Sequence, residues 1–401
     1  MVAKKLIVRR ILRAAERVAK GKSPINRWNP VPHPLRDVPV DHLLLGKEGR
    51  TLASDYAYLT RDILRFSTPA TQSPHLDLLR KHAAEGPSLF LPARFMETAY
   101  YRNAAECIAA TGDYFGETGV EGIIRRARYF AENPSRPATS PIQVLSIADS
   151  DCYQIFDGYH RIARAIFNQQ TSISVQPIGD PVHTPAQELL LRVKWQKGRP
   201  ELYQPIDLPE VKTWTTVRRC ADRFSMMQHF LQGKLARGSY IDLGCSYGWF
   251  VREMGKLGFD SSGIDSDRKT LNVGQKLYGI PEKRLDRGRL PKWAHKNSNR
   301  RYDVVSLFSV AHHFVRGWGG CTAEELVRSV DKITDQVLFF DTGEAHEGFF
   351  GGELAQWTPE FIQKWLKSNT TFSEVIPLGK DEDGAPPFAT SYGRTLFACV
   401  R

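Results

Sequence analysis

The sequence has no long hydrophobic run and no paired cysteines. No apolar stretch in its 401 residues approaches the roughly 18 consecutive residues that a membrane-spanning helix needs. The six cysteines are scattered without a C-x-x-C pair, which disfavours a structural zinc site and indicates a reducing compartment. The chain also opens without the charged start, apolar run and small-residue cleavage site of a signal peptide. We therefore expect a cytoplasmic protein, soluble or attached to a membrane surface.

Outside its first 22 residues the chain lacks a strong excess of positive charge. The formal net charge is +11, but residues 1–22 hold eight Lys or Arg against one Glu and account for +7 of it. The remaining +4 does not require a surface that follows nucleic-acid phosphates, so a nucleic-acid partner is disfavoured.

Residues 1–22 place apolar side chains at helical spacing, mostly opposite the basic ones, which predicts a cationic amphipathic helix. Three interpretations stay open: docking on its own domain, peripheral contact with an anionic membrane, and a targeting or nucleic-acid arm. The proline-rich stretch that follows predicts an extended connector, so residues 1–40 form an arm and a connector.

The length of the chain exceeds what one hydrophobic core usually organises, so two folded domains are expected. We place a smaller α+β domain at residues 41–195, a linker at 196–211 and an α/β domain at 212–401. The last domain shows a helix over 214–235 and then short apolar strands that alternate with helical segments, the strands at 239–243, 261–264, 303–309, 336–341, 372–377 and 395–400. Such alternation predicts a parallel sheet with helices on both faces.

The stretch YIDLGCSYGWF, residues 240–250, contains an apolar strand, a glycine turn and the start of a helix. Turn glycines such as Gly244 and Gly248 let a backbone approach a ligand, and the first helical turn offers free N–H groups. The next strand ends in Asp265, 21 residues after Gly244, where an acid can accept hydrogen bonds from ribose hydroxyls. The two features in this order predict a cofactor that contains adenosine.

DLGCSYGWF followed by GID resembles the first two motifs of class I S-adenosylmethionine-dependent methyltransferases, with Ser246 where the family often has a central glycine. The resemblance covers about residues 212–401 and implies a Rossmann-like sheet of seven strands that binds S-adenosylmethionine. In this resemblance Asp265 binds the ribose diol and Asp286 meets the adenine amine. The full set of implied cofactor-binding positions is Asp242, Gly244, Cys245, Gly248, Asp265 and Asp286.

The segment SVAHHF follows the fourth strand, where the acceptor pocket of the family opens. His312 and His313 are the candidate general bases, because imidazole titrates near neutral pH. The alternative is that one of them packs at the strand end while the other lines the pocket. The segment DTGEAH adds Asp341, Glu344 and His346 as polar acceptor contacts, and three loop residues without a fourth ligand do not predict a metal site.

The chain lacks the Asn/Asp-Pro-Pro-aromatic loop and the Pro-Cys nucleophile that nucleobase methyltransferases carry. Direct methylation of DNA bases is therefore disfavoured. An oxygen of a small molecule, lipid or glycan is the expected acceptor.

The segment DGYHRIARA, residues 157–165, opens a helix between two strands. We expect Asp157 to cap the helix, Gly158 to form a tight turn, and His160 with Arg161 to make an anion site in the first turn. A capped helix with exposed His and Arg is the alternative. The segment resembles the Asp-Gly-x-His-Arg signature of the ParB and sulfiredoxin-like superfamily, which implies that these positions bind phosphate or a nucleotide such as ATP or CTP.

We therefore predict a methyltransferase with an N-terminal module that binds phosphate or a nucleotide. One alternative is a bifunctional enzyme that phosphorylates its acceptor and then methylates it. Another is a nucleic-acid or envelope binding protein that only senses S-adenosylmethionine.

Overall fold

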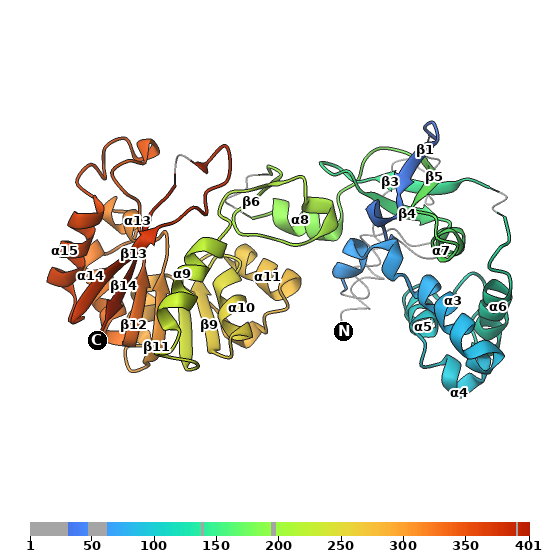
Figure 1. Ribbon diagram of the computed structural model, residues 1–401, viewed down its shortest axis with the longest axis horizontal. Helices are drawn as coiled ribbons and strands as arrows, with labels where there is room; N and C mark the ends of the chain where they lie inside the picture. The colour runs from blue at the N-terminus through green and yellow to red at the C-terminus, as the bar shows by residue number, and fades with distance from the viewer. Residues whose placement is uncertain (1–30, 47–61, 138–139, 194–197, 390–391) are drawn as a thin grey trace, which may run out of the picture.

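The computed structural model describes residues 31–46, 62–137, 140–193, 198–389 and 392–401. The basic segment 1–22 and its predicted amphipathic helix lie outside the described residues. Figure 1 shows two large sheets with their own helices, and helix α8 (Pro185–Leu191) and the short strand β6 (Glu201–Leu202) between them. Among the helices described, none combines the length and the apolar character needed to cross a membrane.

The C-terminal sheet has seven strands in the order β10-β9-β8-β11-β12-β14-β13. Strands β8 to β12 run parallel, and β14 is antiparallel to both of its neighbours. The order confirms the predicted seven-stranded α/β sheet. The strand bounds are β8 Ser239–Leu243, β9 Asp260–Asp265, β10 Leu285–Arg287, β11 Tyr302–Leu307, β12 Thr334–Phe340, β13 Glu374–Lys380 and β14 Thr395–Val400.

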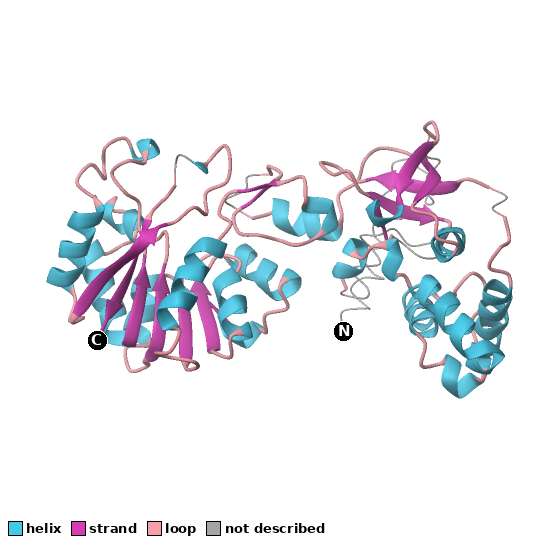
Figure 2. Ribbon diagram, in the orientation of Figure 1, coloured by secondary structure: helices cyan, strands magenta, loops and turns pink. Residues whose placement is uncertain are grey.

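Helices cover both faces of this sheet, as predicted (Figure 2). Because side chains alternate along a strand, Ile241 and Val305 face one hydrophobic cluster and their neighbours Tyr240 and Val304 face another. The first cluster includes residues of α14 (Ala323–Ile333) and α15 (Pro359–Asn369), and the second includes residues of α9 (Ala221–Leu231) and α10 (Trp249–Lys256). The remaining helices of the domain are α11 Arg268–Leu277, α12 Leu290–Lys296 and α13 Ala311–Val315.

Helix α9 is shorter than the sequence predicts, because the residues expected as its first turns are not helical. Cys220 takes a left-handed φ of 66° directly before the helix starts. Trp214 is buried in a hydrophobic cluster, and Thr215–Thr216 form the short strand β7, parallel to β6 (Glu201–Leu202). The apolar side chains over 214–220, whose spacing predicts a helix, are therefore buried without forming one.

The N-terminal sheet has five strands in the order β1-β5-β3-β4-β2. Helix α7 (Tyr159–Phe167) connects β4 to β5, as the sequence predicts. Strand β1 pairs with β5, so the boundary expected at residue 40 lies inside this sheet. The bounds are β1 Arg36–Pro39, β2 Leu43–Leu44, β3 Ile142–Ser146, β4 Tyr153–Asp157 and β5 Ser172–Pro177, beside helices α3 Pro74–Glu85, α4 Pro92–Phe95, α5 Ala99–Thr111 and α6 Val120–Glu132.

Residues 198–214, which we call the joint, pack against the C-terminal domain. They include the whole described part of the predicted linker, residues 198–211. Leu202, Ile206 and Trp214 share one hydrophobic cluster with Tyr247 and Val273 of the C-terminal domain. The segment expected as a linker is therefore part of a folded core.

The joint is also bonded to the N-terminal domain. Glu210 is fully buried and accepts hydrogen bonds from the hydroxyls of Ser67 (2.5 Å) and Thr184 (3.0 Å). Burial raises the pKa of Glu210, and these two hydrogen bonds act in the opposite direction. The indole of Trp214 donates to the carbonyl of Asp149 at 3.0 Å. The joint thus connects the two domains through buried polar contacts.

Candidate functional site

The glycine turn follows the carboxyl end of β8, which pairs with β9 on one side and with β11 on the other. Gly244 and Gly248 have φ values of +86° and +84°, and a Cβ on Gly244 would lie 2.5 Å from Val310 Cγ2. Cys245, in contrast, turns its thiol into a buried apolar cluster, where burial raises its pKa well above the usual range. Gly244 and Gly248 fit the predicted turn, and Cys245 can contribute only backbone groups to a ligand.

Asp265 closes the turn from the end of β9. Its carboxylate accepts hydrogen bonds from the backbone N–H of Ser246 (3.0 Å) and of Asp267 (2.8 Å). Each oxygen keeps lone-pair capacity for a second donor, such as a ribose hydroxyl. The structure thus brings Asp265 and the glycine turn together, at the carboxyl ends of parallel strands where open α/β sheets bind their ligands.

Asp242 is a buried carboxylate beneath the same turn. It is 2% exposed and accepts a hydrogen bond from Ser306 Oγ at 2.7 Å. Burial raises its pKa to about 7, against the lowering effects of the Ser306 hydrogen bond and of Arg223. Asp242 therefore lacks full compensation of its negative charge, and a nearby cation would favour its ionised form.

Asp286 lies on β10, next to β9 in the sheet. The indole Nε1 of Trp293 donates to its carboxylate at 3.2 Å. A Cβ on Gly288 would come within 3.1 Å of Ile264 Cδ1, so the backbone passes close to the strand that ends in Asp265. The position fits the implied contact with adenine, and this role stays a prediction.

The side chain of Gln204, in the joint, forms hydrogen bonds with the glycine turn. The sequence does not predict this contact. Its side-chain Nε2 donates to the carbonyl of Cys245, and its Oε1 accepts from the N–H of Trp249, each at 3.3 Å. The side chain is 4% exposed. No sequence spacing indicates this contact, because Gln204 lies 41 residues before Cys245.

His312 and His313 differ in their surroundings. His312 is buried, and its Nδ1 accepts the N–H of Gly343 at 3.3 Å, which places the proton of the neutral ring on Nε2. Burial, with Arg394 and His313 nearby, lowers the pKa of His312 well below its usual value. His313 is accessible to solvent and stacks on Trp318, with ring centroids 5.9 Å apart. Of the two candidate bases, only His313 is accessible to an acceptor.

A buried ion network lies beside these histidines. Arg223 contacts Asp341 at 2.8 Å and Asp383 at 2.9 Å, and all three side chains are at most 3% exposed. Arg394 pairs with Glu347 at 2.8 Å. Burial alone would raise the pKa of Asp341, but Arg223, Arg394 and Arg218 hold it below its usual value.

The expected polar contacts Asp341, Glu344 and His346 do not form one exposed cluster. Asp341 belongs to the ion network, and Glu344 is 2% exposed, accepts the N–H of Thr395 and lies 3.4 Å from His346. In the part of the chain that the structure describes, no three His, Cys, Asp or Glu side chains are placed to hold a metal ion.

The start of α7 differs from the expectation in one respect. Gly158, with φ 117°, occupies the N-cap position, and Asp157 makes no capping hydrogen bond. The Asp157 carboxylate pairs instead with Arg161, whose guanidinium also donates to Ser140 and Pro141. Arg161 is thus engaged within the protein. His160 contacts the Tyr100 hydroxyl at 3.0 Å.

The parallel sheet, the glycine turn and the acid at the end of β9 have the arrangement of a Rossmann-like nucleotide site. Residues 217–316 match a family model described as a methyltransferase domain, so the chain contains a methyltransferase domain. A comparison with curated proteins finds no match.

Several solved structures are similar to part of this chain. One is a crystal structure of WbdD, a bifunctional kinase-methyltransferase, which is 19% identical in sequence. The match covers 54% of this chain and 46% of WbdD, with a TM-score of 0.43. This chain thus matches about half the length of WbdD. Magnesium protoporphyrin IX methyltransferase from Synechocystis PCC 6803 with bound SAH is 16% identical, covering 45% of this chain and 81% of that one with a TM-score of 0.34. The methyltransferase domain of bacterial CtHen1 is 19% identical, covering 45% and 98% with a TM-score of 0.34.

Proposed function

We propose that the C-terminal domain binds S-adenosylmethionine at the carboxyl ends of β8 and β9 and transfers its methyl group to an oxygen of a small molecule, lipid or glycan. The observation that carries the proposal is the position of Asp265. Two backbone N–H groups orient its carboxylate beside the left-handed turn at Gly244.

The surrounding residues suit the parts of this cofactor. The acid at the end of β9 can bind the ribose hydroxyls, and Asp286 on the adjacent strand can accept from the adenine amine. Asp242, buried and incompletely compensated, can stabilise the positive methionine end. Methyl transfer from a sulfonium is an in-line displacement, so these residues contribute chiefly by aligning the donor.

His313 is the proposed general base for a hydroxyl acceptor. Partial burial, Arg394 and Arg316 lower its pKa, so the ring is neutral at pH 7 and can accept a proton. His312 is proposed to position it, because the two rings lie 4.2 Å apart and His312 is anchored by Gly343.

Calorimetry of the full chain with S-adenosylhomocysteine tests the cofactor site. Asp265→Ala is expected to weaken binding by at least about 100-fold, because two charge-assisted hydrogen bonds to the ribose hydroxyls, of roughly 1.5–3 kcal/mol each, are lost. Asp260→Ala, at the other end of the same strand and exposed, is the matched control and should leave the affinity unchanged. Absence of binding by the wild-type protein would sink the proposal.

A screen of metabolite extracts with a labelled methyl donor tests the acceptor. Label is expected on a product whose methyl group resists conditions that cleave esters of carboxylic acids but is lost on ether cleavage. His313→Gln should reduce labelling while the affinity for S-adenosylhomocysteine stays the same. Label on nitrogen or carbon would contradict the proposed oxygen acceptor.

A further inference from the structure

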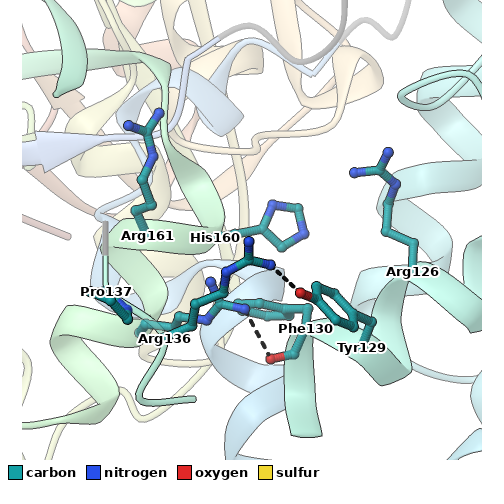
Figure 3. A pocket seen from close by; sticks show the side chains of 8 residues that line it. Arg126, Tyr129, Phe130, Arg136, Pro137, His160 and Arg161 are labelled. Carbon is teal, nitrogen blue, oxygen red and sulfur yellow. Dashed lines mark hydrogen bonds between the residues drawn. The ribbon is translucent and has the colours of Figure 1, made fainter. Parts of the chain in front are cut away.

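A pocket of about 220 Å³ lies between α6 and α7 in the N-terminal domain. Figure 3 shows His160 in its middle, with the side chains of Arg126 and Arg136 on different sides of the ring. Arg161 stands apart, and its guanidinium group is directed away from the others. The complete lining is Arg126, Tyr129, Phe130, Arg136, Pro137, His160, Arg161 and Arg164.

Three of the four arginines have no carboxylate partner among the residues that the structure describes. Arg126 donates to the carbonyl of Phe115 at 3.2 Å, and Arg164 to the carbonyl of Phe130 at 3.5 Å. Arg136 donates to the hydroxyl of Tyr129. The Nε atoms of Arg126 and Arg164 are buried and make no hydrogen bond. These guanidinium groups therefore keep both charge and donor capacity for a ligand.

Arg161 provides the contrast within the same pocket. Its charge is paired with Asp157 through Nη2, and its Nη1 donates to Ser140 and Pro141. The arginine that the sequence motif singles out is therefore the least available one. The available charge comes from Arg126 and Arg136, which lie outside that motif, and from Arg164.

The positive charges of these arginines repel one another and disfavour a protonated His160. Burial and Arg136 lower the pKa of Arg164, and burial with Arg126 and Arg164 lowers the pKa of His160 to about 3. The imidazole stays neutral, so it adds no charge to the cluster. A multivalent anion in the pocket would offset this repulsion, and guanidinium groups match phosphate oxygens in geometry.

The volume of the pocket limits the size of the ligand that it can hold. Pockets for whole drug-sized ligands measure roughly 300–1,000 Å³. A pocket of about 220 Å³ suits a phosphate group with a small substituent rather than a complete nucleotide.

We propose that the pocket between α6 and α7 binds a phosphate group, free or as the monoester of a small molecule, through Arg126, Arg136 and Arg164. The pocket shares His160 and Arg161 with the anion site expected at the start of α7, but its available charge comes from Arg126, Arg136 and Arg164. The proposal does not depend on methyl transfer.

Titration of the full chain with inorganic phosphate and with glycerol 3-phosphate tests the proposal, and glycerol is the uncharged control. The wild-type protein should bind at least one phosphate compound and not glycerol, with an affinity that falls as NaCl rises. Arg136→Gln and Arg164→Gln should each weaken binding about 10- to 100-fold, the effect of losing one charge-assisted contact. Arg136 is exposed, so its variant should keep the fold even if Arg164→Gln does not.

Arg125→Gln is the matched control, because Arg125 lies on α6 next to Arg126, is exposed and pairs with Glu117 at 3.4 Å. If glycerol 3-phosphate binds more tightly than inorganic phosphate, the ligand is a phosphate monoester. If the two bind equally, the ligand is the free phosphate ion. Both results support the proposed site. The proposal is overturned if neither compound binds at millimolar concentration, if glycerol binds as well, or if Arg125→Gln weakens binding as much as Arg136→Gln. Titration of the same samples with S-adenosylhomocysteine reports separately on the methyltransferase domain.

Discussion

Both domains gather arginines, but they compensate them differently. In the C-terminal domain Arg223 and Arg394 are buried and each meets carboxylates, among them Asp341 and Glu347, at ion-pair distance. In the N-terminal domain Arg126 and Arg136 meet only carbonyl, hydroxyl and aromatic groups among the described residues. The first arrangement holds segments together, and the second leaves charge available for a ligand.

Asp242 is the acidic counterpart of the N-terminal arginines. It lies in the C-terminal domain near Arg223, yet burial still raises its pKa to about 7. An uncompensated carboxylate favours a cation as an uncompensated guanidinium favours an anion. The comparison therefore separates structural charges from the charges that we propose to bind ligands, and four experiments test it.

The largest effect is expected from breaking the compensated network. Arg223→Ala would remove the guanidinium that lies closest to Asp341 and pairs with Asp383, which should cost about 3–5 kcal/mol of unfolding free energy. Urea unfolding followed by tryptophan fluorescence measures it, because six of the eight tryptophans lie at or after residue 214. Arg219→Ala, an exposed neighbour, should change stability by less than about 0.5 kcal/mol. Equal losses in the two variants would contradict the structural role of the network.

The next effect concerns the uncompensated acid. Ionised Asp242 attracts the positive end of the cofactor, so affinity for S-adenosylhomocysteine should be highest above pH 7 and should fall as Asp242 is protonated below its pKa of about 7. The fall should approach about tenfold per pH unit. Calorimetry from pH 5.5 to 8 measures it. Asp242→Asn should bind more weakly at pH 8 and lose this slope, and an unchanged slope would assign the titration to another group.

A smaller effect is expected at the contact between the joint and the glycine turn. Gln204→Ala removes two neutral hydrogen bonds to Cys245 and Trp249, so affinity for S-adenosylhomocysteine should fall about tenfold. Asp207→Ala, in the same segment and exposed, is the control and should bind as the wild type does. If Gln204→Ala retains full affinity, the turn does not need this support.

The smallest effect has the opposite sign to that of Arg223→Ala. In phosphate-free buffer at low salt, Arg136→Gln should leave the N-terminal domain unchanged or stabilise it by up to about 0.5 kcal/mol, because it removes repulsion from an exposed residue. Thermal melting followed by circular dichroism measures it. Added phosphate should raise the melting temperature of the wild type and of Arg125→Gln more than that of Arg136→Gln. A clear destabilisation would place Arg136 among the structural charges.

The parts of the site that the sequence predicts are those built by neighbours in the chain. The alternation of strands and helices, the turn at Gly244 and the acid at Asp265 all follow from local patterns within one strand-turn-helix unit and the next strand.

The missed parts depend on contacts between distant segments. Gln204 reaches the turn from the joint, and Arg126 meets Arg164 only because α6 packs near α7. The predicted helix over 214–220 failed for the same reason, because burial of Trp214 in the joint outweighs local helical preference. Asp157 was expected as a cap but forms an ion pair with Arg161.

The packing of the joint determines which fragment of this protein can be expressed alone or exchanged between related chains. A fragment that begins at residue 212 would lose Leu202 and Ile206, and would expose the apolar surface around Tyr247 and Val273. It would also lose Gln204, whose side chain forms hydrogen bonds with the glycine turn. The transferable unit is therefore the C-terminal sheet together with the joint and α8, so recombination between related chains should preserve activity only when the crossover falls before Pro185–Leu191.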